Sequence, residues 1–334
     1  MSGRNRPRKQ HYIPRSYLAG FADTGARAGM VWVHDADRGT LRPQRPEATA
    51  HEADLHTVIG PGGQKDDRIE EMIGGIEAKG MPVLRRLVAR EQPTPQERAD
   101  FASFVALMHV RTRPFRHGWA AARVHMLQAR LRALAGSDAA MARFRADMAR
   151  EGGHPVSDAD VAALRAVLPV MGERMTAEVG REWALRALSV HDALAPALFD
   201  MDWTVLTAPE GNVFATSDNP VVFFDPRPGP RLHGLRARGV RLTFPLASSV
   251  CLLADWSAGG RARLRFGRAH PAFVRFANEV RVAWADRMAF SSAPDERLLA
   301  ALRARPSGRP PVEFVVTSLT DRERMTVQVK RGGT

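Results

Sequence analysis

Residues 203–224, WTVLTAPEGNVFATSDNPVVFF, decide the fold class of this chain. Two runs rich in β-branched and aromatic residues, 203–207 and 213–216, flank the turn-forming sequence PEGN, and together they predict a β-hairpin. A third apolar run, 221–224, predicts another strand. The stretch therefore opens a sheet-rich subregion of about residues 200–330, which we expect to be mainly antiparallel, with one or two helices.

Upstream of that stretch the sequence has helical periodicity. Between about residues 66 and 198, apolar side chains recur at intervals of three and four from Ile69 onward, which predicts a central region like a helical bundle. Thr94, followed by a proline and then by Glu97, has the pattern of a capping box at the start of one of these helices. A further helix is expected over residues 176–188.

The N-terminal part predicts a β-hairpin segment before the helices. Residues 30–34, of which the first four are apolar, predict a strand that leads to a turn containing Gly39, and a partner strand is expected near Leu41. The order of elements predicts an α+β fold. Residues 1–9 are expected to form a flexible basic arm, and we find no linker polar enough to divide residues 10–334, which we expect to be a single domain.

The bulk composition narrows the class of protein. The chain has 334 residues, 44% of them hydrophobic, and no apolar run approaches the roughly 20 residues needed to span a bilayer. The start is polar and basic with no apolar segment after it, so a secretory signal is not expected. The single cysteine, Cys251, lies in an apolar run and is interpreted as a core thiol. A cytoplasmic protein without membrane association is the expectation.

The strong basic charge has two explanations. A net charge of +13 favours contact with a polyanion such as nucleic acid. However, only four of the 49 basic residues are lysines, which is typical of a GC-rich coding genome. Codon bias accounts for arginine in place of lysine, but it does not account for the excess of basic residues over the 36 acidic ones. Both explanations stay open.

Two polar segments are candidates for a site. His11 precedes a proline-fixed backbone, where its imidazole could serve as a general base or metal ligand, or could tether the N-terminal segment. Ser217, Asp218 and Asn219 lie in a polar sequence between two apolar runs, where strand ends often present functional groups. The same sequence is also typical of an Asx turn, which would be structural.

A third candidate is the arginine cluster Arg111, Arg113 and Arg116, which lies where Pro114 interrupts the helical pattern. Guanidinium groups bind phosphate or carboxylate through paired hydrogen bonds. Glu70 and Glu77 are seven residues apart on the preceding helix and so share one face. We interpret them as salt-bridge partners of the arginines in preference to metal ligands. The sequence contains no phosphate-binding glycine loop, no nucleophile elbow and no zinc-ligand spacing.

The order of these segments resembles one bacterial family. The sequences QHYIP at 10–14, RTRPFR at 111–116, TSDNP at 216–220 and FPL at 244–246, together with Asn278, are similar to the domain-of-unknown-function family 4238 over roughly residues 8–292. The resemblance implies that His11, Arg111, Asp218 and Asn219 belong to one site, with Asn278 in support. It implies no activity. Arg15 departs from the family pattern, where a smaller or amide residue is expected.

The leading hypothesis from the sequence is a phosphodiesterase, most simply a nuclease that acts on RNA or DNA. In it His11 is a general base or metal ligand, Asp218 and Asn219 bind a divalent metal such as Mg²⁺ or Mn²⁺ or orient water, and the arginines neutralise the phosphate. The alternatives are a non-catalytic nucleic-acid or ligand-binding protein of a bacterial defence or regulatory system, and an enzyme acting on a small anionic metabolite or peptide. The sequence predicts neither the oligomeric state nor the identity of a metal.

Overall fold

The computed structural model describes residues 9–53, 58–59, 65–66, 68–152, 156–174, 190–225, 237, 239–256, 262–305, 313–316 and 327–330. The chain divides into two compact units. The first comprises residues 1–116, 180–229 and 233–307, and the second comprises residues 117–179, 230–232 and 308–334. The first unit thus takes elements from both predicted subregions, and the single domain over residues 10–334 stays a prediction. Most of the expected basic arm and the helix over 176–188 lie outside the described residues.

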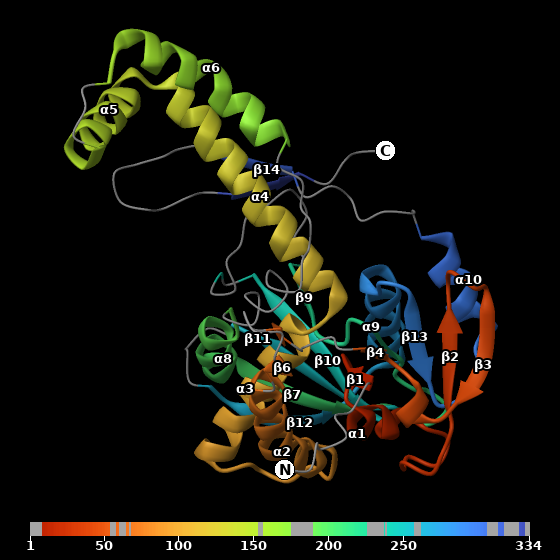
Figure 1. Cartoon of the computed structure of the whole chain (residues 1–334). Coiled ribbons are helices and arrows are strands. Elements are labelled where there is room, and N and C mark those ends of the chain that lie inside the picture. The colour runs from red at the N-terminus through yellow and green to blue at the C-terminus, as the bar shows by residue number, and fades with distance from the viewer. Residues whose placement is uncertain are drawn as a thin grey trace, which may run out of the picture. The chain divides into compact units, whose positions relative to one another are not determined.

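A five-stranded sheet forms the centre of the first unit (Figure 1). The strand order is β12-β7-β11-β10-β9, and only β12 and β7 run parallel. The strands are β7 (Asp202–Thr207), β9 (Val222–Phe224), β10 (Arg241–Ala247), β11 (Val250–Asp255) and β12 (Leu264–Arg268). The expectation of an α+β fold with a mainly antiparallel C-terminal sheet is confirmed.

Alternate side chains of this sheet enter two different cores, as the two-residue repeat of a strand requires. Trp203 and Leu252 join the main core together with helices α2 (Arg68–Val88), α3 (Pro95–Val110) and α8 (His191–Asp200). Their neighbours Leu206 and Cys251 face the opposite way, towards helix α9 (Pro271–Trp284). The sheet is therefore covered by helices on both faces, and Cys251 is a buried core thiol as expected.

The helix ends follow from local sequence. The Thr94 side chain accepts a hydrogen bond from the Glu97 amide at 3.2 Å, and the Glu97 carboxylate accepts one from the Thr94 amide at 2.7 Å, so the predicted capping box is confirmed. Gly80 lets α2 approach α3 closely, because a Cβ at this position would lie 2.6 Å from Cγ of Phe104.

A second sheet of the first unit has the order β3-β2-β13-β8. The predicted N-terminal hairpin forms its edge, with β2 (Val31–Asp35) antiparallel to β3 (Thr40–Gln44). The remaining strands are β13 (Met288–Ser291) and β8 (Thr216–Ser217), and helix α10 (Glu296–Ala304) contacts β2, β3 and β13.

The hairpin expected over residues 203–216 is wrong. β7 is occupied on both edges, by β11 and β12, so residues 213–216 have no place beside it. The second apolar run instead crosses to the other sheet, where Thr216 and Ser217 pair with β13. A turn is nevertheless present, since the Asn212 amide donates to the carbonyl of Pro209 at 3.1 Å. This crossing brings Asp218 to the base of the second sheet.

Short elements precede the helices: β1 (Lys9–His11), α1 (Arg15–Leu18), the 3₁₀ turns η1 (Ala19–Phe21) and η2 (Pro46–Ala48), β4 (His51–Ala53), β5 (Val58–Ile59) and β6 (Lys65–Asp66). The second unit contains most of α4 (Arg113–Gly136), together with α5 (Asp138–Gly152), α6 (Asp158–Arg174), β14 (Glu313–Val316) and β15 (Val327–Lys330). Met141 and Leu168 belong to the core that joins α4, α5 and α6. Among the described residues no helix is long and apolar enough to cross a membrane.

Candidate functional site

The predicted residue His11 lies beside a second histidine. Strand β1 pairs with β4 so that His11 is opposite His51, and their rings meet edge to face with centroids 5.5 Å apart. Nε2 of His11 lies 3.2 Å from the carbonyl oxygen of Glu47. Burial lowers the pKa of His11, and the nearby His51 acts in the same direction. His11 thus tethers the N-terminal segment and places Tyr12 and His51 on either side of it.

Arg111 joins three segments of the chain. Its side chain is 1% exposed, and its guanidinium donates to the carboxylate of Glu77 on α2 and to the main-chain carbonyl of His11. The ion pair between Glu77 and Arg111 is the structural role expected for Glu77. Glu70 lies seven residues earlier on the same helix and is half-buried. Arg111 therefore fixes the N-terminal strand against α2 and α3.

The other two arginines of the cluster differ in environment. Arg116 is 6% exposed, and burial lowers its pKa to about 10, with Glu52 acting in the opposite direction. Arg113 is 43% exposed at the start of α4, and its Nε lies 3.1 Å from the carboxylate of Glu52 on β4. Of the three arginines in the cluster, Arg113 is the one that lines the cavity described below.

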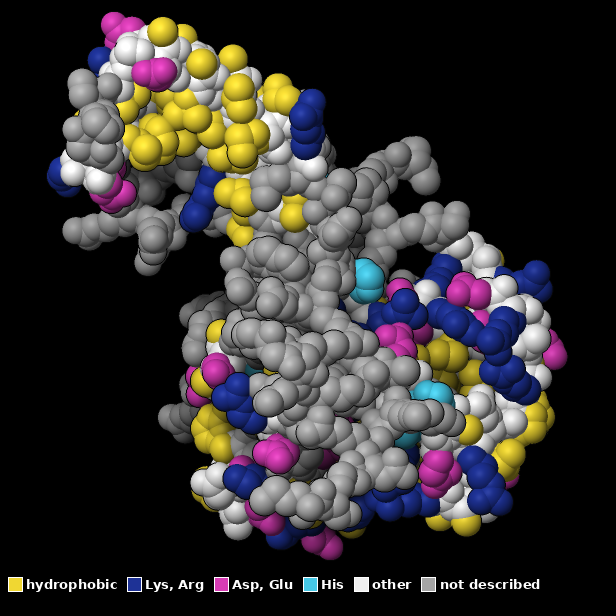
Figure 2. Space-filling view, viewed as in Figure 1, with side chains coloured by type: hydrophobic (Ala, Val, Ile, Leu, Met, Phe, Trp, Pro, Cys, Tyr) yellow, Lys and Arg dark blue, Asp and Glu magenta, His cyan; other side chains and the backbone are white. Residues whose placement is uncertain are grey.

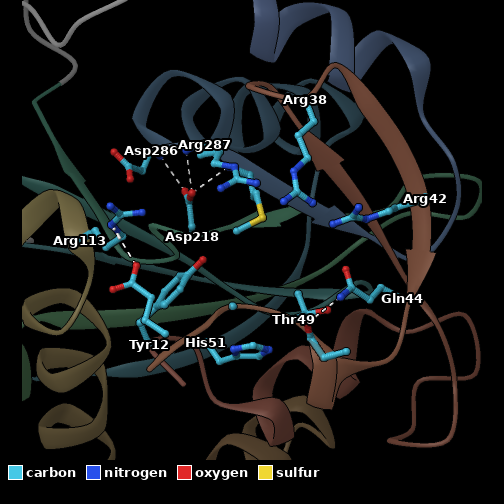
Figure 3. Close-up of a pocket in the computed structure, with 14 residues that line it drawn as sticks. Tyr12, Arg38, Arg42, Gln44, Thr49, His51, Arg113, Asp218, Asp286 and Arg287 are labelled. Carbon is cyan, nitrogen blue, oxygen red and sulfur yellow. Dashed lines mark hydrogen bonds and ion pairs between the residues drawn. The ribbon is translucent and has the colours of Figure 1, made fainter. Parts of the chain in front are cut away.

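Asp218 is held by three consecutive backbone amides. Its carboxylate accepts hydrogen bonds from the N–H groups of Asp286 at 2.7 Å, Arg287 at 2.7 Å and Met288 at 2.8 Å (Figure 3). Burial raises the pKa of Asp218 to about 6, although the three amides oppose this shift. The carboxylate therefore clamps the turn between α9 and β13, and few of its acceptor positions remain for another ligand.

The residues that surround Asp218 in the sequence brace the same turn. The Ser217 hydroxyl donates to the carbonyl of Asn219 and accepts from its amide, which is a serine-based turn in place of the expected Asx turn. Nδ2 of Asn219 donates to the carbonyl of Trp284 at 2.9 Å. Asn278 on α9 accepts from the Ala215 amide at 2.8 Å and donates to a neighbouring carbonyl. These three side chains act on the backbone and give the Asp218 segment its shape.

A cavity of about 380 Å³ in the first unit lies between these segments. Of the predicted site residues, Asp218 and Arg113 line it. Figure 3 shows Tyr12 and His51 on one side and Arg38 and Arg42 on the other, directed into the same space. The full lining comprises Tyr12, Arg38, Arg42, Gln44, Ala48, Thr49, Ala50, His51, Glu52, Arg113, Asp218, Asp286, Arg287 and Met288. We call this cavity the arginine pocket.

Two hydrogen-bond donors of the arginine pocket are unused. Tyr12 is 4% exposed, and its hydroxyl has no hydrogen-bond partner in the described part of the chain. Nε of Arg42 is buried and likewise has no partner there. The pocket wall also contains Ala50 with φ 55°, a left-handed conformation that is costly for a residue other than glycine and is often found at functional sites.

The remaining charges of the pocket are largely paired. The guanidinium of Arg287 donates to both oxygens of Asp35, at 3.0 and 2.6 Å, and lies 3.5 Å from Asp37. Asp35 is fully buried, and its hydrogen bonds to Arg287 keep its pKa low against the effect of burial. The guanidinium of Arg38 approaches Asp35 only to 3.9 Å, although the Arg38 amide donates to Asp35 at 3.2 Å. The cations that remain for a ligand are therefore Arg38 and Arg42, with Arg113 shared with Glu52.

Several pocket residues were not singled out from the sequence. No motif of the sequence marks Tyr12 or His51 as a site residue in its own right. The signal that could have found His51 is its position in a short strand that pairs with the conspicuous QHYIP segment. Arg38 and Arg42 alternate with apolar residues around a predicted turn, but nothing local shows which of 45 arginines faces a cavity.

The described residues contain no group of three or more His, Cys, Asp or Glu side chains that could hold a metal ion. Asp218 accepts from backbone amides and Nδ2 of Asn219 donates to a backbone carbonyl, whereas Oδ1 of Asn219 is buried without a hydrogen-bond partner in the described part of the chain.

Comparison with known proteins gives one result. No curated protein and no solved structure matches the chain. A family profile described as a protein of unknown function matches residues 9–295, a range that contains every residue of the arginine pocket. The chain therefore belongs to the family of proteins of unknown function DUF4238.

Proposed function

We propose that the protein binds a phosphodiester in the arginine pocket and hydrolyses it, with nucleic acid as the substrate. The observation that carries this proposal is that Tyr12 and Arg42 line one cavity from opposite sides, while the Tyr12 hydroxyl and Nε of Arg42 have no hydrogen-bond partner in the described part of the chain. A buried donor without a partner, such as Nε of Arg42, loses about 1–3 kcal/mol relative to a bonded one. A ligand rich in acceptors can accept from the Tyr12 hydroxyl and from the Arg42 guanidinium.

The positive charges of the arginine pocket favour an anionic ligand over a neutral ligand that is equally rich in acceptors. The Arg38 and Arg42 guanidiniums and the Tyr12 hydroxyl can donate several hydrogen bonds to one group, and the two guanidiniums cannot accept any. A phosphoryl group offers acceptor oxygens in all directions, and guanidinium binds two of them at once. The net charge of +13 attracts a polyanion from a distance, especially at low ionic strength.

His51 supplies the group for proton transfer. In the reaction a water oxygen attacks phosphorus, the bond from phosphorus to the leaving oxygen breaks, and the proton lost by water passes to that leaving oxygen. His51 lines the pocket together with Tyr12, and an imidazole can carry this proton. Arg38, Arg42 and Arg113 stabilise the charge that builds on the phosphoryl oxygens. Asp218 acts indirectly, by holding the wall that contains Arg287.

Binding is tested with inorganic phosphate by calorimetry on Tyr12→Phe, Arg42→Gln and, as a matched control, Arg275→Gln on the exposed face of α9. Losing one hydrogen bond of about 1–1.5 kcal/mol weakens binding about 5- to 10-fold for Tyr12→Phe. We expect a similar or larger loss for Arg42→Gln and none for the control. Wild-type affinity in both pocket variants would exclude the pocket as the phosphate site.

Turnover is tested with labelled single- and double-stranded RNA and DNA in Mg²⁺, Mn²⁺ or EDTA. We expect cleavage by the wild type and a strong loss in His51→Gln, with a smaller loss in His11→Ala, because His11 acts through His51. Absence of cleavage by the wild type under every condition would refute hydrolysis.

Binding without turnover is the second candidate, and one observation favours it. Among the residues that line the pocket, Asp218 is the carboxylate that is almost fully buried. It accepts hydrogen bonds from three backbone amides and is therefore not free to activate water. In that case the calorimetric results above hold, and no substrate is cleaved.

A further inference from the structure

A row of arginines leads away from the arginine pocket along one edge of the second sheet. Arg42 lies on β3, the first strand in the sheet order, and Arg38 lies in the turn between β2 and β3. Arg303, near the end of α10, reaches the same turn, since its guanidinium carbon lies 3.6 Å from the position of a Cβ on Gly39. Figure 2 shows basic side chains gathered over β2, β3 and α10.

The acidic groups of this turn do not neutralise the row. Asp35 and Asp37 both direct their carboxylates to Arg287, which leaves the guanidinium of Arg38 with a single approach of 3.9 Å to Asp35. Arg303 is exposed and forms no ion pair within the described residues. Arg38, Arg42 and Arg303 therefore present three guanidiniums with unused donors.

The geometry of the row suits a chain of linked anions. Arg38 and Arg42 both line the arginine pocket. Arg303 does not line the pocket but adjoins the turn that carries Arg38. A single small anion fills the pocket without touching Arg303, whereas a polymer with regularly spaced phosphates contacts pocket and row together.

We propose that the ligand is a single strand of nucleic acid, with one phosphate in the arginine pocket beside Arg42 and Arg38 and the next phosphate at Arg303. This inference rests on the proposed phosphate site. The strand is single because Tyr12 lies 96% buried in a cavity of about 380 Å³, which admits a phosphate of a flexible strand. A duplex holds its phosphates on the outside of a stiff rod and cannot place one beside the Tyr12 hydroxyl.

The test is the dependence of binding on length and salt. Fluorescent oligonucleotides of two, four, eight and twelve nucleotides, single-stranded and duplex, are titrated with the full chain between 50 and 300 mM NaCl. The variants are Arg303→Gln and the matched control Arg297→Gln, which is exposed on the same helix. Binding of inorganic phosphate by the wild type is measured in parallel.

We expect the affinity to rise from the dinucleotide to the octanucleotide and to exceed that for the duplex. One phosphate contact contributes about 0.7 to the slope of log affinity against log salt for a single strand, so Arg303→Gln flattens the slope by about 0.7, and Arg297→Gln leaves it unchanged. Equal affinity for two and eight nucleotides, a duplex bound as tightly, or an unchanged slope in Arg303→Gln would overturn the inference. Absence of phosphate binding in the wild type would instead mark failure of the proposed function.

Discussion

Replacing Asp218 by asparagine changes one atom of a clamp that holds three backbone amides. The carboxylate accepts from Asp286 through Oδ1 and from Arg287 and Met288 through Oδ2. The asparagine side chain has the same shape but only one acceptor oxygen, so at least one amide loses its partner. A hydrogen bond to a charged group contributes about 1.5–3 kcal/mol, and the two remaining bonds weaken when the charge is lost.

A second effect has the opposite sign and depends on pH. Burial raises the pKa of Asp218 to about 6 from an ordinary value of 3.8. The folded state therefore retains a proton that the unfolded state loses between these two pH values, and the free energy of unfolding falls as the pH rises through this window. One pKa unit corresponds to about 1.36 kcal/mol, so between pH 4.5 and pH 6 the wild type loses about 2 kcal/mol that Asp218→Asn does not lose.

We therefore expect Asp218→Asn to be destabilised relative to the wild type by about 2 kcal/mol more at pH 4.5 than at pH 7. Urea unfolding is followed by tryptophan fluorescence, to which the buried Trp203 contributes, at pH 4.5, 5.5, 6.5 and 7.5. Glu71→Gln, exposed on α2, is the control and shows no such trend. A difference that is constant, or that grows with pH, would show that the three amides outweigh burial and would refute this reasoning.

Three further predictions concern other parts of the first unit. Glu52→Gln frees Arg113 from its carboxylate partner, so inorganic phosphate is expected to bind about 3- to 10-fold more tightly in calorimetry, and an unchanged affinity would exclude Arg113 from the ligand shell. Gly80→Ala forces α2 away from Phe104 and is expected to reduce the free energy of unfolding by about 1–3 kcal/mol; a variant as stable as the wild type in urea would contradict the close approach. Burial raises the pKa of Cys251 to about 12, so iodoacetamide at pH 8 should label the thiol only after denaturation, which mass spectrometry detects.

The parts of the fold that the sequence predicts are those set by neighbours along the chain. The Thr94 capping box and the β2–β3 hairpin each depend on contacts within about twenty residues. The error at residues 213–216 arose because a local turn signal is the same whether the following strand returns or crosses to another sheet. Only the occupancy of both edges of β7 decides between them.

The candidate site was predictable only in part, for a related reason. Asp218 and Arg113 were selected for their polar surroundings in the sequence, and both line the pocket. Arg42 could not be distinguished from the other arginines, because what sets it apart is a buried Nε without a partner, a property of the assembled fold. Arg111 has the same local sequence context as Arg113 but is used to tie His11 to α2.

The arginine pocket is assembled from segments that lie far apart in the chain, from Tyr12 to Met288. A molecule that occupies it must therefore bind the folded first unit and not the unfolded chain, so occupancy shifts the folding equilibrium. At a concentration of 100 times its dissociation constant, such a ligand adds about 2.7 kcal/mol to the free energy of unfolding. Thermal stability measured across a library of nucleotides, oligonucleotides and small anions can consequently identify the natural ligand before any reaction is known.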